Sequence, residues 1–236
     1  MAGCPLGSEP RRRGGDQYIP RPADWRIGDD APWPTPAPVL GADEVADRVA
    51  ARPYQGSFEP DFEGARPSAV LVVLADGDDG AEVLLTRRSM HLSSHRGEVS
   101  FPGGRVDSGE GYEAAALREA HEEVGLRPDQ VRLIGHLQPM GTYVSRSWIV
   151  PVVARVPTPL PLVGATAEVD RVLWVPLRDL TSPGTYREEY WRMGDVERAL
   201  FFFELDDETV WGATARMLHQ LLRVAHDIEG HEPPAL

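Results

Sequence analysis

Apolar and β-branched residues gather in short runs along the chain, and clusters of polar residues and glycine separate these runs. Runs of this length and composition are typical of β-strands. The sequence Asp-Gly-Asp-Asp-Gly at 76–80 favours a turn, so we expect the strands on either side of it to form a hairpin. The predicted strands cover residues 68–75, 82–86, 131–137, 147–156, 169–175 and 201–205.

Three other segments have a composition or an apolar spacing that predicts a helix. Residues 41–52 place Val45 and Val49 one turn apart, behind two acidic residues near the start. Residues 113–124 are rich in alanine, leucine, arginine and glutamate, and Gly125 then favours a helix end. Residues 214–226 repeat apolar side chains along one helical face. This order of strands and helices predicts a mixed α+β domain.

The first 41 residues differ in composition from the rest of the chain. They are rich in proline, glycine and arginine, which favours extended backbone over helix. Trp25 and Trp33 indicate that part of this segment packs on the domain, because large aromatic side chains bury well. A chain of 236 residues with 42% hydrophobic content can bury one sizeable core. We therefore expect an N-terminal arm at 1–41, one domain at 42–230 and a C-terminal tail at 231–236.

Charge and cysteine content narrow the function classes. The net charge of −13 repels long nucleic acid, although a small phosphorylated substrate is feasible if divalent cations neutralise the site. The acidic excess can equally serve solubility alone. No apolar run approaches the roughly 20 residues of a membrane span, and the start lacks a signal-type apolar core, so we expect a cytoplasmic protein without a membrane partner. Cys4 is the single cysteine, which excludes an intramolecular disulfide and a cysteine-based zinc cluster.

Three carboxylates mark the predicted helix at 113–124. Glu119, Glu122 and Glu123 stand at positions i, i+3 and i+4, which share one helical face. Like charges so placed are destabilising unless a cation bridges them, and carboxylate oxygens suit Mg²⁺ or Mn²⁺. Spacing alone favours a solvated acidic face over a metal site.

The surrounding residues favour the metal interpretation. Gly104, five residues, Glu110, seven residues and then Arg118-Glu119-Ala120-His121-Glu122-Glu123-Val124-Gly125-Leu126 resemble the Nudix box, GX5EX7REUXEEXGU, at every constrained position. The resemblance implies a Nudix fold, with a mixed β-sheet sandwiched between helices and a loop-helix-loop at the box. It also implies that Glu119, Glu122 and Glu123 bind Mg²⁺ or Mn²⁺ and that a water molecule attacks a diphosphate. Arg118 would hold a neighbouring glutamate or form an ordinary helix salt bridge, and Glu110 would be structural.

The general base stays open. It is either a glutamate of the box or one from another loop, such as Glu168 before the strand predicted at 169–175. Glu168 taken alone also fits an ordinary surface residue. We include it among the candidate catalytic residues.

A second pattern lies upstream of the box. It runs Leu84-Leu85-Thr86-Arg87-Arg88-Ser89, then Leu92, His95, Gly97-Glu98-Val99 and Phe101-Pro102-Gly103-Gly104. This pattern resembles the coenzyme A diphosphatase branch of the Nudix hydrolases, LLTxRSxxLRxHxGxVxFPGG. The sequence Trp-Gly-Ala-Thr-Ala at 211–215 also resembles the start of the last helix in that branch. The resemblance implies substrate-binding roles for Arg87, Arg88, His95, Gly97, Phe101, Gly103 and Gly104.

One position departs from the branch, which has arginine where this chain has Ser93. Arg87, Arg88, Arg96 or His91 can supply the missing positive charge to a phosphate. His95 either bonds the substrate or braces the loop before Gly97, and Phe101 is expected to pack the glycine loop.

Three functions remain in view. The leading hypothesis is a coenzyme A diphosphatase that releases 3',5'-ADP and 4'-phosphopantetheine, or their acyl counterparts. The second is a broader nucleoside diphosphate-X hydrolase for ADP-ribose, NADH or dinucleoside polyphosphates. The third is a Nudix domain that senses nucleotides without catalysis, although the intact glutamates argue against it. In each case the partner is a small nucleotide-like molecule, and a homodimer is possible.

Overall fold

The computed structural model describes residues 14–15, 17–92, 96–142 and 145–229. Within these residues a mixed sheet of eight strands forms the centre. Its main path is β4 (Val99–Ser100), β3 (Gly80–Arg88), β2 (Arg66–Gly77), β8 (Ser147–Arg155) and β6 (Arg132–His136). Three more strands pair beside this path: β5 (Gly103–Arg105) with β2, β7 (Met140–Thr142) with β8, and β9 (Val169–Pro176) with β3. The β2–β8 pair is parallel, and the other pairs are antiparallel.

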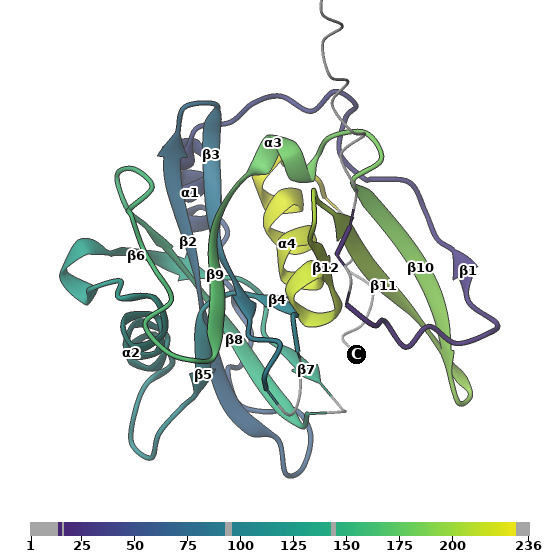
Figure 1. Cartoon of the computed structure of the whole chain (residues 1–236), viewed down its shortest axis with the longest axis horizontal. Helices are drawn as coiled ribbons and strands as arrows, with labels where there is room; N and C mark the ends of the chain where they lie inside the picture. Colours follow the sequence, from purple (N-terminus) through teal and green to yellow (C-terminus); the bar gives the residue numbers. More distant parts are fainter. Residues whose placement is uncertain (1–13, 16, 93–95, 143–144, 230–236) are drawn as a thin grey trace, which may run out of the picture.

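Helices cover both faces of this large sheet. Helix α2 (Tyr112–Val124) lies on one face, and α1 (Ala42–Ala50), α3 (Leu177–Leu180) and α4 (Gly212–Ala225) lie on the other (Figure 1). The alternation along β2 explains the two layers, because successive strand side chains point to opposite faces. Leu71 and Val73 pack with α2, whereas Val72 and Leu74 pack with α4. The expected α+β fold, a mixed sheet between helices, is confirmed.

A second, smaller sheet lies beyond α4. Among the described residues it contains β1 (Arg26–Ile27), β10 (Tyr186–Met193), β11 (Val196–Glu204) and β12 (Thr209–Trp211), in that order. Helix α4 lies between the two sheets (Figure 1). The sequence predicted only the end of β11 at 201–205. The first half of β11 and all of β10 were missed because charged residues interrupt their apolar pattern.

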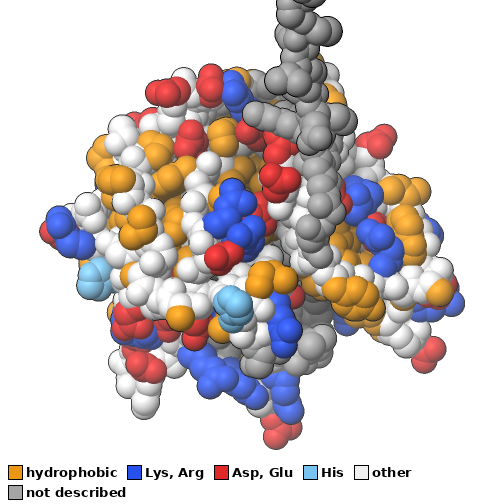
Figure 2. All heavy atoms as spheres, in the orientation of Figure 1, with side chains coloured by type: hydrophobic (Ala, Val, Ile, Leu, Met, Phe, Trp, Pro, Cys, Tyr) orange, Lys and Arg blue, Asp and Glu red, His pale blue; other side chains and the backbone are white. Residues whose placement is uncertain are grey.

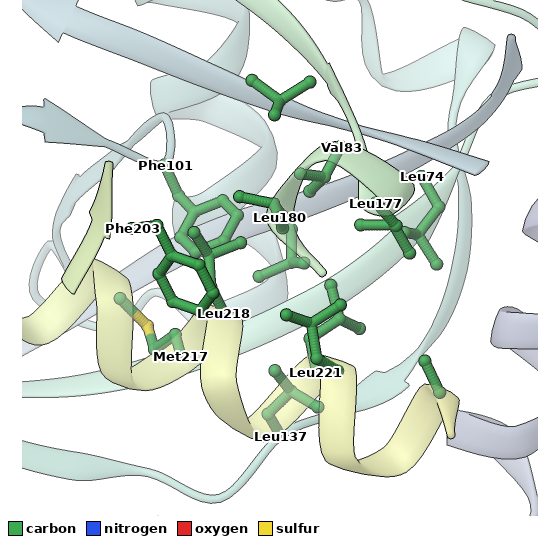
Figure 3. Close-up of a cluster of buried hydrophobic side chains, with 14 of the residues drawn as sticks. Leu74, Val83, Phe101, Leu137, Leu177, Leu180, Phe203, Met217, Leu218 and Leu221 are labelled. Carbon is green, nitrogen blue, oxygen red and sulfur yellow. The ribbon is translucent and has the colours of Figure 1, made fainter. Parts of the chain in front are cut away.

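The main core fills the space between the large sheet and α4. Leu74 and Val83 from the sheet meet Leu218 and Leu221 from the helix, and Phe203 closes the layer from the small sheet (Figure 3). These side chains are all fully buried, and each such burial stabilises the fold by about 1.5–3 kcal/mol. The core therefore joins the C-terminal helix and the small sheet to the large sheet.

The described part of the predicted N-terminal arm packs on the small sheet. Trp33 is 4% exposed and contacts the edge of Tyr186 at a centroid distance of 4.9 Å. Arg21 donates two hydrogen bonds of 2.7 Å to Glu189, which is completely buried. Trp25 is 37% exposed, so Trp33 rather than Trp25 supplies the buried aromatic anchor.

Turn-forming residues and glycine in the sequence correctly predicted the ends of several strands and helices. The hairpin formed by β2 and β3 is confirmed, although both strands extend into the turn cluster as far as the Gly77–Gly80 pair. Helix α2 ends as expected, because Gly125 adopts φ +74° in the left-handed region. A short 3-10 helix, η1 (Pro128–Gln130), follows it. None of the helices in the described ranges is long and apolar enough to cross a membrane.

Candidate active site

Helix α2 has small buried side chains on one face and carboxylates on the other. Ala115, Ala116 and Ala120 are fully buried against the large sheet, which lets the helix backbone lie close to the strands. On the other face the side chains of Glu119 and Glu122 are 19% and 55% exposed. The predicted carboxylate face is therefore present, with Glu119 recessed and Glu122 at its rim.

Arg118 holds this face in place. Its Nη1 donates a 2.9 Å hydrogen bond to Oε1 of Glu119 and lies 3.5 Å from Oε2 of Glu122. Its Nε and Nη2 each donate a 3.0 Å hydrogen bond to the carboxylate of Glu110, whose pKa is lowered by these bonds. Nη2 also donates to the carbonyl oxygen of Arg105 at 3.0 Å. Arg118 thus ties α2 to the preceding loop, and its contact with Glu119 has the expected geometry.

The glycines before the box are required by close packing. A side chain at Gly103 would collide with the carbonyl oxygen of Ala69 on β2, with which β5 pairs. A Cβ at Gly104 would lie 2.5 Å from the carboxyl carbon of Glu119. The backbone N–H of Gly103 donates a 3.2 Å hydrogen bond to Oε2 of Glu123. The two glycines therefore let β5 and the α2 carboxylates share a narrow space.

Glu123 has the most perturbed carboxyl group at this site. Burial raises its pKa to about 7, although the hydrogen bond from Gly103 opposes this rise. The negative charge of Glu119 raises the pKa further, and the positive charge of Arg88 lowers it. Glu119 and Glu123 are thus close enough to repel each other, which is a reason for a cation to bind between them.

Arg88 and Glu168 complete the same region. Nη2 of Arg88 donates to Oε2 of Glu168 at 3.1 Å, and the charges of both residues act on Glu123. The backbone N–H of Ser89 also donates to the carbonyl oxygen of Glu168 at 2.7 Å. These two hydrogen bonds hold Glu168, the residue before β9, next to the end of β3 and near Glu123. Gly97 adopts φ +65°, and its N–H donates to the carbonyl oxygen of Arg88 at the end of β3.

The structure does not place every predicted site residue near the glutamates of α2. Arg87 points to the opposite face of the sheet, where Asp170 and Glu208 bind it. Phe101 is 2% exposed in the main core on the α4 side of the sheet, whereas the box glutamates belong to α2 on the other side. His95 and Ser93 lie outside the described residues. Glu208 is the residue that sequence reasoning missed, because the run Asp206-Asp207-Glu208 reads as an ordinary acidic turn.

The carboxylates of Glu119, Glu122 and Glu123 are of the chemical type that binds a hard divalent cation. In the described part of the chain no three His, Cys, Asp or Glu side chains are gathered closely enough to hold a metal ion as they stand. Arg118 engages Glu119 and Glu122, and Gly103 engages Glu123. The carboxylate oxygens are of the type that Mg²⁺ and Mn²⁺ prefer, and the repulsion between Glu119 and Glu123 favours a cation. These glutamates would therefore release part of their protein hydrogen bonding when an ion binds.

Comparisons with known proteins show which family and which fold this chain resembles. The NUDIX domain family matches residues 65–196, which include the large sheet and α2. The Escherichia coli protein described as uncharacterized Nudix hydrolase NudL is 39% identical over 159 residues, or 66% of this chain and 81% of that protein. The crystal structure of a MutT/nudix family protein from Enterococcus faecalis is similar with a TM-score of 0.50 and 22% identity, covering 76% of this chain and 68% of that chain. This last similarity concerns the fold alone.

Proposed function

Because this chain belongs to the Nudix family, we propose that it hydrolyses the diphosphate bond of coenzyme A or acyl-coenzyme A. At the coarser level, the chain is a Nudix hydrolase that acts on phosphorus-containing anhydrides. The proposed products are 3',5'-ADP and 4'-phosphopantetheine, which keeps the acyl group of an acyl substrate. In this reaction the oxygen of water bonds to one phosphorus, and the bond from that phosphorus to the bridging oxygen breaks.

One observation carries the proposal: the two sequence patterns meet in space. Arg88 belongs to the pattern that resembles the coenzyme A branch, and Glu123 belongs to the Nudix box. The charge of Arg88 acts directly on the carboxyl group of Glu123, and its guanidinium binds Glu168. A positive side chain beside the candidate metal ligands supports recognition of a phosphorylated substrate at this place.

Enzymes of this family work with divalent metal ions, and we propose Mg²⁺ or Mn²⁺ for this chain. Glu119 and Glu123 would hold the ion, with Glu122 at the exposed rim. Such an ion neutralises the diphosphate oxygens and stabilises the charge that develops on the attacked phosphate.

The chain's own residues then have distinct tasks. Arg118 orients Glu119 through a 2.9 Å hydrogen bond, and the Gly103 N–H orients Glu123. Glu168 is our candidate for the base that accepts the proton of the attacking water, and Arg88 orients its carboxylate. The alternative, a broader nucleoside diphosphate-X hydrolase, would use the same groups.

The test is a panel of coenzyme A, acetyl-coenzyme A, ADP-ribose, NADH and diadenosine tetraphosphate, each with Mg²⁺ or Mn²⁺ and with products identified by mass. We expect the highest kcat/KM on coenzyme A or its acetyl form. Glu113→Gln is the control, because Glu113 lies on α2 but pairs with His136 rather than with Arg118. Preferential cleavage of ADP-ribose would favour the broader hydrolase, and binding without cleavage would favour a sensor.

The same panel examines phosphate recognition by Arg88. We expect Arg88→Ala to lose more activity on coenzyme A than on 3'-dephospho-coenzyme A, because arginine binds phosphate strongly. Arg132→Ala is the control, since Arg132 is 63% exposed on β6. Equal losses on both substrates would remove the 3'-phosphate role and leave Arg88 as a partner of Glu168.

A further inference from the structure

Two arginines face each other at the end of β3 that leads to the site. In the β3–β9 register Arg87 is directly opposite Arg171. Like charges in directly opposed strand positions destabilise a sheet unless a counter-charge neutralises them. Figure 2 shows basic and acidic side chains together near the middle of the face in view. In Figure 1 this place lies between β9 and α4.

Glu208 supplies the counter-charge to both arginines. Its Oε1 accepts hydrogen bonds from Nη1 of Arg87 at 3.0 Å and from Nη1 of Arg171 at 2.6 Å. Glu208 is 3% exposed. Burial raises its pKa, and the two guanidinium groups oppose that rise. A buried carboxylate that joins two strands in this way is costly to disrupt, because removal of one partner leaves charge without compensation.

The register of the two strands shifts immediately beyond this pair. Arg87 pairs with Arg171, but Arg88 pairs with Val169, so Asp170 has no partner of its own across the ladder. Asp170 instead accepts a 3.1 Å hydrogen bond from Nε of Arg87. An irregularity of this kind re-aims the adjacent side chain. Here it turns Asp170 toward Arg87. Arg88 lies on the α2 face by ordinary strand alternation, since Leu84 packs on that face and Leu85 on the other, and it meets Glu168, the residue before Val169.

Glu208 comes from a different layer of the molecule. It lies between β11 and β12 of the small sheet, outside the range 65–196 that the family match covers. Its N-terminal neighbours form a closed turn, in which the Leu205 N–H donates to the Glu208 carbonyl oxygen at 2.8 Å. Through Glu208, the small sheet thus contacts the ends of β3 and β9, next to Arg88 and Glu168.

We infer that Glu208 is a positioning residue for the proposed reaction. By neutralising Arg87 and Arg171, it holds the irregular end of the β3–β9 pair and so keeps Arg88 aimed at Glu168. This inference rests on the proposed function of the site. Glu208 itself lies on the opposite face of the sheet and acts only through the strand ends.

A double-mutant cycle in the full chain tests the inference, using Glu208→Gln, Arg88→Ala and both together. Glutamine keeps the size of Glu208 and removes its charge. We expect Glu208→Gln to lower kcat about tenfold with little change in KM, and to change kcat less than about twofold when Arg88 is already alanine. Independent, multiplicative effects of the two substitutions would overturn the inference.

Glu189→Gln is the matched control. Glu189 is completely buried in the same small sheet and pairs with Arg21 and Arg187, neither of which belongs to β3 or β9. We expect this variant to lower the melting temperature and leave kcat unchanged. An equal loss of kcat in Glu189→Gln would mean that Glu208 acts through general stability alone, and the inference would fall.

Amide hydrogen exchange gives a readout that needs no substrate. Peptides that contain Ser89 and Val169 should exchange faster in Glu208→Gln than in the natural chain, and Glu189→Gln should not change them. Unchanged protection of these peptides in Glu208→Gln would overturn the inference. If the natural chain cleaves nothing in the panel, the proposed function fails while the exchange experiment still decides the role of Glu208. If Glu208→Gln does not fold, Glu208→Asp replaces it with the same expected outcomes, because its shorter side chain draws the carboxylate away from Arg87 and Arg171.

Discussion

Helices α2 and α4 pack on opposite faces of one sheet in very different ways. Helix α2 buries mainly alanines, such as Ala116 and Ala120, and exposes a face of carboxylates. Helix α4 buries larger side chains, including Met217, Leu218 and Leu221, between two sheets (Figure 3). Because apolar stabilisation scales with buried area, α4 contributes far more to folding than α2 does.

The candidate site and the main source of stability therefore lie on opposite faces of the sheet, the site at α2 and the apolar core at α4. Small side chains let α2 lie close to β2 and β5, so that Gly103 and Gly104 touch its carboxylates. The mutual repulsion of those carboxylates lowers the stability of the α2 side. The apolar burial around α4 offsets this loss. We therefore expect substitutions on α2 to change activity with little loss of stability, and substitutions on α4 to do the reverse.

The largest expected effect is on the α2 side. Replacing both Glu119 and Glu123 by glutamine should lower kcat/KM more than about 1,000-fold, equivalent to about 4 kcal/mol, because both candidate metal ligands lose their charge. The melting temperature should stay constant or rise, since two repelling charges are removed. Activity is measured with saturating Mg²⁺ or Mn²⁺, and ion binding by titration calorimetry. Undiminished turnover would show that α2 is not the catalytic helix.

The opposite result is expected on the α4 side. Leu218→Ala should lower the free energy of unfolding by about 2–5 kcal/mol, because Leu218 is fully buried and the truncation leaves a cavity. Its kcat per folded molecule should match that of the natural chain. Leu133→Ala, at a leucine that is 42% exposed on β6, is the control for urea unfolding. A large fall in kcat without loss of stability would break the comparison.

The smallest effect distinguishes two glycines next to α2. Gly125→Ala should cost about 1 kcal/mol of stability through its left-handed φ of +74° and leave activity intact, since a Cβ there would meet no atom within 4 Å. Gly104→Ala should instead lower kcat about tenfold, because its Cβ would displace the Glu119 carboxylate. Urea unfolding and steady-state kinetics on both variants provide the measurement. Equal kinetic losses would argue against a specific contact between Gly104 and Glu119.

The sequence by itself determined the local parts of this protein. The i, i+3, i+4 spacing of Glu119, Glu122 and Glu123 fixed a shared helical face, and Gly125 marked the helix end, because both depend only on the geometry of one helix. The short apolar runs of the strands and the apolar face of α4 are likewise local features of the sequence. The spacing of Gly104, Glu110 and Arg118 also predicted that the loop before α2 belongs to the site.

Only the tertiary structure decided which distant groups meet. Strand β10 carries a completely buried Glu189, and nothing in its own sequence shows that Arg21 of the arm would pair with it. Strand alternation separates Arg87 from Arg88 and places Arg88 on the α2 face, but nothing in the sequence shows that Glu208 binds Arg87 or that Glu168 meets Arg88. Pairing energies between residues far apart in the chain leave no periodic trace in the sequence, so these choices appear only when the layers are assembled.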